Sequence, residues 1–566
     1  MKFARINLIY FLVFLFGAAI VARLFFLQAI NGELYRALAK GHQEIFQQIS
    51  GQRGDIFLHD KDNLVLAATN QESQFCYVAP KLIEEKERVA ELLSSILSVS
   101  KDELLNNIQA NSDKLFLLVK RNISTEEGQK IQDLGLEAVY LDQERQRLYP
   151  FGQLASDVLG FVNQNGEGQY GVEGYWNSAL AGHEGWQKIS YGPFGRSTDG
   201  DTAGSMKGVD LTLTIDKNIQ SQAEKILKDY SENFGFKSGQ IIVIEPASGK
   251  VMALADFPGF NPNNYQEYAG NNQIELFQNK GIQTVYEPGS IFKAITMAAA
   301  LNEGKITPDT TYIDIGKVVI KDKTITNYDN RVWGESTMTQ VLERSINTGA
   351  VFAQSQLSHQ AFTDYLERFG VFEKTNIDLS GETYSENNEF KKGWEINYAT
   401  ASFGQGISMN LMQITRAFCA IANKGILVQP YVVEAVMDSG VERPFALENP
   451  LQQIISSDTA EDLTKMLVAV TESGYGSGAR VPGYYIAGKT GTSQIPYSVL
   501  GMDKAGYSGQ TWQSFIGFAP AFSPKFVIAI KLDNPKTKTS SESAVFLFQD
   551  LAKYILDYYQ IAPEKE

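Results

Sequence analysis

The pattern of hydrophobic and polar positions changes along this chain, and its first clear feature is an apolar run near the start. Residues 6–22 carry no charge, follow Lys2 and Arg5, and continue helically to Leu27. This run is just long enough for a short membrane-spanning helix, and the preceding basic residues favour a cytoplasmic N-terminus. A cleaved signal peptide also starts this way, but no clear cleavage site interrupts the pattern. We therefore predict a cytoplasmic tail at 1–5, an uncleaved single-pass anchor at 6–30 and an extracytoplasmic remainder.

The rest of the chain mixes helical and strand patterns. Residues 82–97 repeat apolar positions with helical periodicity, and residues 191–208, rich in Gly, Ser, Thr and Asp, predict a linker or long loop. Short apolar runs predict strands at 209–216, 240–245, 251–256, 484–487, 514–518 and 526–532, the second and third of them forming a hairpin. Helical segments fill the middle. An antiparallel sheet with helices on its faces fits this order, so the predicted fold class is α+β.

Composition narrows the function classes. The chain has 566 residues, with 43% hydrophobic and 20% charged, which fits a protein that buries a large core. A net charge of −15 gives little support for binding nucleic acid. The two cysteines, which are far apart in the chain, exclude a disulfide-rich scaffold. The four histidines are scattered, which argues against a mechanism that needs several histidines.

The strongest candidate chemistry lies at Ser290 and Lys293. Pro288 and Gly289 precede them as turn residues, and a helical run follows to about Gly304. Ser290 is therefore expected at a helix N-terminus, where unpaired N–H groups favour a developing negative charge. Lys293 lies one turn later on the same face, and burial would allow its amine to act as a base toward the serine hydroxyl. Taken alone, the pair indicates little, because Ser-x-x-Lys is a common pattern that a serine N-cap followed by a solvated lysine also produces.

Two further motifs follow in the chain. Ser345 and Asn347 form S-x-N, suited to passing protons and holding an amide, although a polar turn would look the same. Residues 489–492 read K-T-G-T, with Lys489 expected on a strand to attract a carboxylate and Gly491 expected to allow close substrate approach. Residues 483–490 also match a phosphate-loop pattern, but strand-forming residues and the following Gly491 argue against a nucleotide site.

These motifs, in this order, resemble the penicillin-recognising serine transpeptidases with S-x-x-K, S-x-N and K-T-G. The likeness to class B penicillin-binding proteins extends to EPASGKVMALADFP, YEPGSIFK, ASFGQGISM, AGKTGTS and SFIGFAPAFSPKF, and to RGDIF and YPFGQLASDVLGFVNQNGEGQYGVEGYW nearer the N-terminus. The resemblance implies an elongated N-terminal pedestal of the dimerisation-domain type at 31–205. It also implies a transpeptidase domain with a penicillin-binding, β-lactamase-like fold at 206–566.

The resemblance also implies a mechanism for D,D-transpeptidation without a metal or cofactor. Ser290 would attack the penultimate D-Ala carbonyl of a peptidoglycan stem peptide while Lys293 takes its proton, and the backbone N–H groups of Ser290 and Thr492 would bind the oxyanion. Ser345 would relay the proton to the leaving D-Ala and Asn347 would hold the peptide amide. Lys489, Thr490, Gly491 and Thr492 would form the substrate-binding strand, with Lys489 and Thr490 holding the donor carboxylate.

The resemblance implies several partners: lipid-linked or nascent peptidoglycan, β-lactams, the cytoplasmic membrane, a membrane glycosyltransferase and divisome proteins. No glycosyltransferase signature precedes Ser290, and neither nucleic acid nor nucleotide is expected. The stretch around residues 160–174 resembles division-type relatives, while an elongation role stays open. Two other classes also stay open. One is a β-lactam-hydrolysing or β-lactam-sensing relative, for which Glu382 is the nearest candidate base by position, and the other is a catalytically inactive scaffold.

Overall fold

The computed structural model describes residues 16–17, 44–49, 51–182, 185–192, 195–203, 207–445 and 451–565. The chain divides into two compact units, one from residues 1–54 and 178–209 and the other from residues 55–177 and 210–566. The predicted anchor at 6–30 lies outside the described residues apart from 16–17. Across the described ranges, no helix combines the length and apolar character needed to cross a membrane.

The first unit contains a three-stranded antiparallel sheet in the order β1-β8-β9, formed by Glu44–Ile49, Gly185–Gly192 and Gly195–Ala203. Most of the segment 191–208 therefore lies in paired strands, and the prediction of a linker there is wrong. Backbone hydrogen bonds can pair two strands whatever side chains the strands carry. A segment rich in Gly, Ser, Thr and Asp therefore gives no alternation of apolar and polar residues from which to predict a strand.

The second unit begins with a mixed sheet in the order β19-β18-β10-β2-β3-β4, with β5 paired to β3. Its strands are β2 (Ile56–Asp60), β3 (Asn63–Val78), β4 (Leu117–Ile123), β5 (Val139–Leu148), β10 (Asp210–Asp216), β18 (Val433–Asp438) and β19 (Val441–Pro444). The strand predicted at 209–216 is confirmed as β10, which runs parallel to β2 and antiparallel to β18. Segments far apart in the chain thus share one sheet.

Three helices pack near β3, β4 and β5 around a separate hydrophobic core: α3 (Lys86–Leu97), α4 (Lys101–Ala110) and α5 (Thr125–Leu134). The predicted helix at 82–97 is confirmed as α3, except that α3 starts four residues later. Residues Pro80–Leu82 form a separate 3-10 turn, and Ile83 is extended. The buried face of α3 carries Val89, Ala90, Leu93 and Leu97, which matches the helical spacing of its sequence.

The main core surrounds a five-stranded antiparallel sheet in the order β12-β11-β23-β22-β21. The strands are β11 (Ser238–Ile244), β12 (Val251–Phe257), β21 (Ala487–Pro496), β22 (Tyr507–Ala519) and β23 (Phe526–Asp533). Strands β11 and β12 confirm the predicted hairpin, and the strands predicted at 514–518 and 526–532 lie within β22 and β23. The strand predicted at 484–487 is wrong in position, because β21 begins at its last residue.

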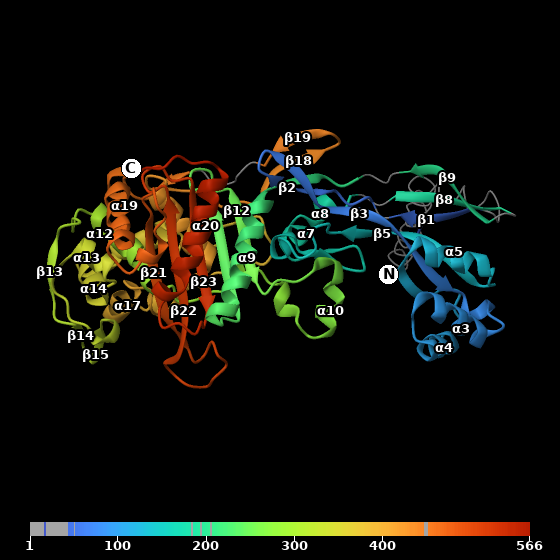
Figure 1. Ribbon diagram of the computed structural model, residues 1–566, viewed down its shortest axis with the longest axis horizontal. Coiled ribbons are helices and arrows are strands. Elements are labelled where there is room, and N and C mark those ends of the chain that lie inside the picture. The colour runs from blue at the N-terminus through green and yellow to red at the C-terminus, as the bar shows by residue number, and fades with distance from the viewer. Residues whose placement is uncertain are drawn as a thin grey trace, which may run out of the picture. The chain divides into compact units, whose positions relative to one another are not determined.

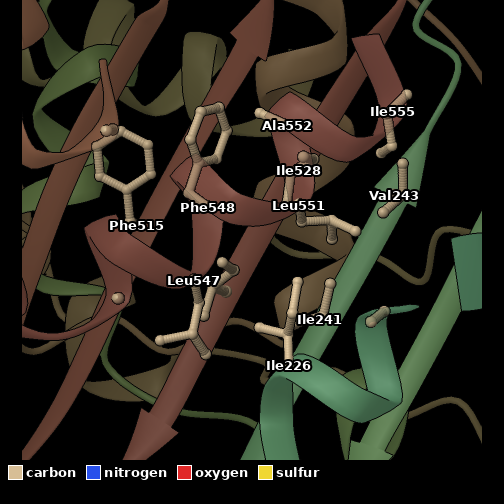
Figure 2. Packing of buried hydrophobic residues seen from close by; sticks show 14 of the residues in the cluster. Ile226, Ile241, Val243, Phe515, Ile528, Leu547, Phe548, Leu551, Ala552 and Ile555 are labelled. Atoms are coloured by element: carbon tan, nitrogen blue, oxygen red, sulfur yellow. The ribbon is translucent and has the colours of Figure 1, made fainter. Parts of the chain in front are cut away.

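Helices cover both faces of this sheet, which explains why β23 is buried along nearly its whole length. Helices α9 (Lys217–Phe234) and α20 (Ala544–Tyr558) pack on one side, and α18 (Leu411–Ala422) contacts β11 and β23 (Figure 1). Figure 2 shows α20 side chains packed against β11, β22 and β23, with Leu547, Phe548, Leu551 and Ile555 forming one stripe of the helix.

A group of helices and two small two-stranded sheets lie beside this sheet. The helices are α12 (Lys293–Asn302), α13 (Met338–Glu343), α14 (Asn347–Ser355), α15 (His359–Arg368), α17 (Glu395–Ala401) and α19 (Ser457–Glu472). Strand β13 (Thr311–Asp314) pairs with β16 (Gly334–Thr337), and β14 (Lys317–Ile320) pairs with β15 (Lys323–Thr326). Shorter helices are α6 (Ser156–Leu159), α7 (Gly171–Tyr175), α10 (Tyr265–Gly270), α11 (Lys280–Gln283) and α16 (Asn388–Lys391).

Two buried carboxyl groups lie where α6 meets β12. Asp157 is 4% exposed and Asp256 is 6% exposed. The Lys280 N–H donates to Asp256 Oδ2 at 2.8 Å, whereas Oδ1 of each aspartate has no hydrogen-bond partner among the described residues. Burial raises the pKa of Asp256 to about 7, and burial together with the charge of Asp256 raises the pKa of Asp157.

Asp256→Asn is expected to raise the thermal unfolding midpoint more at pH 8 than at pH 5. The folded state holds the Asp256 proton up to about pH 7, but the unfolded chain releases it near pH 4, so this group lowers stability as pH rises between those values. Asparagine removes that loss, on the order of 1–3 kcal/mol at pH 8, and its Oδ1 can still accept from Lys280. Thermal unfolding at both pH values, with the exposed Asp322→Asn as control, checks this. An equal shift at both pH values would contradict it.

Candidate active site

The Ser290 turn begins the site. A 3-10 turn, η5 (Gly289–Phe292), continues directly into α12, and Gly289 adopts φ +60°, which glycine reaches without strain. The predicted helix N-terminus at Ser290 is therefore confirmed, and α12 ends at Asn302, just before the predicted end. Ser290 is half-buried, and its hydroxyl makes no hydrogen bond to any residue that the structure describes.

The Lys293 amine is where the first two motifs meet. Lys293 is the first residue of α12 and is fully buried. Its Nζ donates to the carbonyl oxygen of Ser345 at 2.6 Å, to Ser345 Oγ at 3.2 Å and to Asn347 Oδ1 at 2.8 Å. The two motifs are more than fifty residues apart in the chain, and the structure joins them through this one nitrogen.

The S-x-N motif occupies the turn between α13 and α14. Ser345 adopts φ +54°, a left-handed conformation that turns the chain sharply, and Asn347 begins α14. Asn347 Nδ2 donates to the carbonyl oxygen of Thr326 at 3.0 Å, while its Oδ1 accepts from Lys293. Both ends of the amide are thus held in place. Thr326, at the end of β15, contributes only its main chain, and no side-chain signal in the sequence indicates it.

A buried polar cluster attaches the two-stranded β13–β16 sheet to the start of α14. Asp314 accepts from Thr348 Oγ1 at 2.7 Å and from Asn327 Nδ2 at 2.9 Å, and Asn327 Oδ1 accepts from the Thr348 N–H at 3.1 Å. The N–H groups of Gly316 and Trp333 also donate to Asp314. Buried carboxylates with several donors rigidify their surroundings. This cluster, which the sequence did not reveal, fixes the chain next to Asn347.

Lys489 brings the third motif into the same place. It lies in β21, is fully buried, and its Nζ donates to Ser345 Oγ at 3.0 Å and to Thr490 O and Oγ1 at 3.2 and 3.3 Å. The Ser345 hydroxyl therefore lies between two lysine amines, 3.2 Å from Lys293 and 3.0 Å from Lys489. The motif lies within β21, which confirms the expectation that Lys489 is on a strand.

Gly491 is needed for packing inside the protein. A Cβ at this position would lie 2.5 Å from Ser514 Oγ and 2.9 Å from Ile291 Cγ2, so the strand approaches the η5 turn too closely for any side chain. The sequence suggested close substrate approach as the reason, and the structure gives this different one. A Cβ on Gly289 would likewise lie 3.3 Å from Thr492 O, so the chain on both sides of Ser290 lies against β21.

The Thr492 side chain is anchored beyond the strand. Its Oγ1 accepts from the Ser540 N–H at 3.1 Å and lies 3.2 Å from Ser540 Oγ. Ser540 belongs to the 3-10 turn Ser540–Glu542, which precedes α20. Sequence reasoning missed Ser540, because a single serine far along the chain carries no recognisable signal. This contact fixes the part of β21 whose Thr492 N–H is expected to face the substrate carbonyl that Ser290 attacks.

Burial and a neighbouring charge tune the two lysines. Burial, followed by the positive charge of Lys489, lowers the pKa of Lys293 well below its usual range. Burial lowers the pKa of Lys489 to about 7. A lysine with a depressed pKa exists partly as a neutral amine near neutral pH, and a neutral amine can accept a proton. The site therefore holds a potential base in reach of the Ser345 hydroxyl and one helical turn from Ser290.

Glu382, the nearest candidate base for a β-lactam hydrolase, is engaged elsewhere. Its Oε1 accepts from the Thr375 N–H and Oγ1, both at 2.7 Å, and its Oε2 accepts from the Asn376 N–H at 3.0 Å. Glu382 is buried and holds this loop closed. Among the residues that the structure describes, no group of three His, Cys, Asp or Glu side chains is placed to bind a metal ion.

Two family models match the chain. The penicillin-binding protein transpeptidase domain matches residues 239–553, and the penicillin-binding protein dimerisation domain matches residues 48–213. The first of these covers more than half of the chain and includes all three motifs.

Curated relatives and solved structures agree with the two family models. Stage V sporulation protein D of Bacillus subtilis is 30% identical over 537 residues, covering 93% of this chain and 81% of that protein. The peptidoglycan D,D-transpeptidase FtsI of Buchnera aphidicola is 29% identical over 569 residues, covering 98% and 94%. The crystal structure of penicillin-binding protein 3 from Mycobacterium tuberculosis, complexed with aztreonam, has a TM-score of 0.70 at 23% identity, covering 91% and 98%, and shows the same fold. This chain belongs to the class B penicillin-binding proteins.

Proposed function

We propose that this protein is a serine D,D-transpeptidase that cross-links peptidoglycan through an acyl-enzyme on Ser290. The observation that carries the proposal is the Ser345 hydroxyl lying within 3.2 Å of both Lys293 and Lys489, so that the three motifs share one site. A serine hydroxyl becomes a nucleophile when a base close to it takes its proton. Lys293, with its lowered pKa, is the candidate base, and the Ser345 hydroxyl and Lys489 lie beside it. The names of the curated relatives support the same activity.

Acylation starts when the Ser290 Oγ–H gives its proton to the neutral amine of Lys293 and Oγ bonds to the penultimate D-Ala carbonyl carbon. The resulting oxyanion accepts hydrogen bonds from the backbone N–H groups of Ser290 and Thr492. One such donor contributes a rate factor of about 10²–10³. The C–N bond to the terminal D-Ala then breaks, and Ser345, which contacts Lys293, delivers the proton to the departing amine.

Deacylation reverses these roles. The amine of a second stem peptide attacks the ester carbonyl, loses its proton through Ser345 to Lys293, and forms the new amide bond as Ser290 regains its proton. Strand β21 is at the edge of its sheet, so a donor peptide can pair with its free side in extended form. Asn347 would hold the peptide amide, and Thr490 with Lys489 would supply hydroxyl and charge for the donor carboxylate.

Intact-mass analysis after benzylpenicillin treatment tests the proposal. Acylation opens the β-lactam ring without a leaving group, so the expected result is a single adduct of the whole antibiotic's mass, which peptide mapping places on Ser290. Rapid loss of that adduct would favour a β-lactam-hydrolysing protein. No adduct, or an adduct on another residue, would overturn the proposal.

We also infer that the protein works at the outer face of the cytoplasmic membrane in septal wall synthesis. The apolar run at 6–22 supports an anchor at 6–30, and the two family models support a pedestal at 31–205 followed by a transpeptidase domain at 206–566. A membrane glycosyltransferase would supply the glycan strands, and divisome proteins would be its neighbours. Depletion followed by microscopy tests the role: filaments support division, whereas rounded cells support elongation.

A further inference from the structure

The Glu287 carboxylate lies where three segments around Ser290 meet. Tyr507 Oη donates to its Oε1 at 3.1 Å and to its Oε2 at 2.9 Å, and the Gly406 N–H donates to Oε1 at 3.1 Å. The main chain of Glu287 is held as well, because Ser493 Oγ donates to its carbonyl oxygen at 2.7 Å. Glu287 is three residues before Ser290, so this carboxylate and the nucleophile belong to one short turn.

The segment containing Gly406 runs along that turn and is joined to it by main-chain hydrogen bonds. The Gly289 N–H donates to Gly404 O at 3.0 Å, and Tyr286 and Met409 exchange two main-chain hydrogen bonds of 2.9 and 3.0 Å. Gly404 adopts φ +76°, and a Cβ there would lie 2.2 Å from Gly289 O. This segment and the turn therefore form one rigid piece.

The outer end of the β21–β22 hairpin is less firmly attached than the part of β21 that lies beside the η5 turn. Its ladder is regular from Ala487 to Gln494, but the register shifts between Gln494 and Pro496, which pairs with Tyr507. Beyond this point Val499 and Met502 are 58% and 51% exposed. The Tyr507 phenol is therefore the contact that ties the irregular end of the hairpin to the nucleophile turn. The same hairpin carries the Lys489–Thr492 strand.

We propose that Glu287 is a positioning residue for acyl transfer: by accepting hydrogen bonds from Tyr507 and Gly406, it ties the outer end of the β21–β22 hairpin to the rigid piece formed by the nucleophile turn and the 404–409 segment, and so holds the hairpin in register with Ser290. This inference rests on the proposed function. Burial of Glu287 raises its pKa, and the two donors oppose that rise, so the carboxylate depends on them for its charge. Without the Glu287 carboxylate, the outer end of the hairpin would lose this tie to the nucleophile turn, and the placement of β21 beside Ser290 would be less precise.

The test measures acylation by a fluorescent penicillin under single-turnover conditions, which separates the acylation rate constant from the binding constant and counts only folded, reactive protein. A misplacement of about 1 Å costs on the order of 10²-fold in rate. We expect Glu287→Ala and Tyr507→Phe each to lower the acylation rate constant by about 10- to 100-fold with a smaller change in binding, and the double variant to be no slower than Glu287→Ala. Glu287→Gln, which keeps both acceptor contacts in part, should recover much of the rate.

Tyr230→Phe is the matched control, because Tyr230 also donates to a carboxylate, Asp550 Oδ2, at 2.8 Å, but between α9 and α20. Its acylation rate should equal that of the wild type. If Glu287→Ala and Tyr507→Phe lower only the unfolding midpoint and acylate at the wild-type rate, the inference is wrong while the proposed function stands. If the wild type itself is not acylated on Ser290, the proposed function fails first.

Discussion

Ser290→Ala is expected to abolish both the penicillin adduct and the release of D-Ala from a stem peptide. In the proposed mechanism the covalent intermediate forms on the Ser290 oxygen, and no other described hydroxyl combines a helix N-terminus with a buried lysine one turn away. Loss of a nucleophile from such a unit lowers the rate by at least about 10⁴-fold. The measurement is intact mass after penicillin treatment, together with D-Ala release from a stem-peptide analogue.

Two comparisons make this result specific. Ser231→Ala removes an exposed serine hydroxyl on α9, which donates to Lys228 O, and should leave both activities unchanged. Ser290 makes no side-chain hydrogen bond to a described residue, so Ser290→Ala should also keep the wild-type unfolding midpoint. A persistent adduct on the Ser290→Ala protein would mean that another residue is the nucleophile.

Lys293→Arg and Lys293→Met are both expected to lower the acylation rate constant by about 10²–10⁴-fold, the usual contribution of a general base. Arginine keeps the positive charge but stays protonated, whereas methionine keeps much of the volume without a charge. If Lys293 served only as a cation, the arginine variant would remain active. Similar losses in both variants, with folded protein confirmed by thermal unfolding, would show that the neutral amine is the required form.

The pH dependence separates the two lysines. Acylation by the wild type should rise with pH as Lys293 loses its proton, at values well below the usual lysine range because of burial and the charge of Lys489. Lys489→Met removes that charge, so the pKa of Lys293 rises and the rising limb of the profile moves to higher pH. A limb that stays in place would contradict the coupling between Lys293 and Lys489, whatever happens to substrate affinity.

Much of the site could be predicted from short stretches of sequence. The S-x-x-K spacing puts Ser290 and Lys293 on one helical face, and Pro288 and Gly289 mark the turn before them; both expectations depend only on local backbone geometry. The strands of β11, β12 and β23 were likewise readable, because their apolar runs are continuous and sharply bounded.

Other features have no local signal. Strands β8 and β9 form through main-chain pairing in a polar segment. The position of β21 was mispredicted because the lysine and glycine inside this strand do not form an apolar run, although both are buried in the fold. No feature of the sequence predicts the contact between Glu287 and Tyr507, which lie 220 residues apart. Such contacts depend on how distant segments pack, and one chain without related sequences does not encode them in any readable pattern.

The chain's own order of residues was thus enough to determine which groups can do chemistry, a serine, two lysines and an amide, and on which kinds of element they sit. Only the tertiary structure decided that the Ser345 hydroxyl lies between Lys293 and Lys489, from residues 52 and 144 positions away, and that both lysines are buried. The reason is physical: the pKa of a lysine falls far enough for it to act as a base when the protein removes water around it or places a like charge nearby, and both depend on long-range packing.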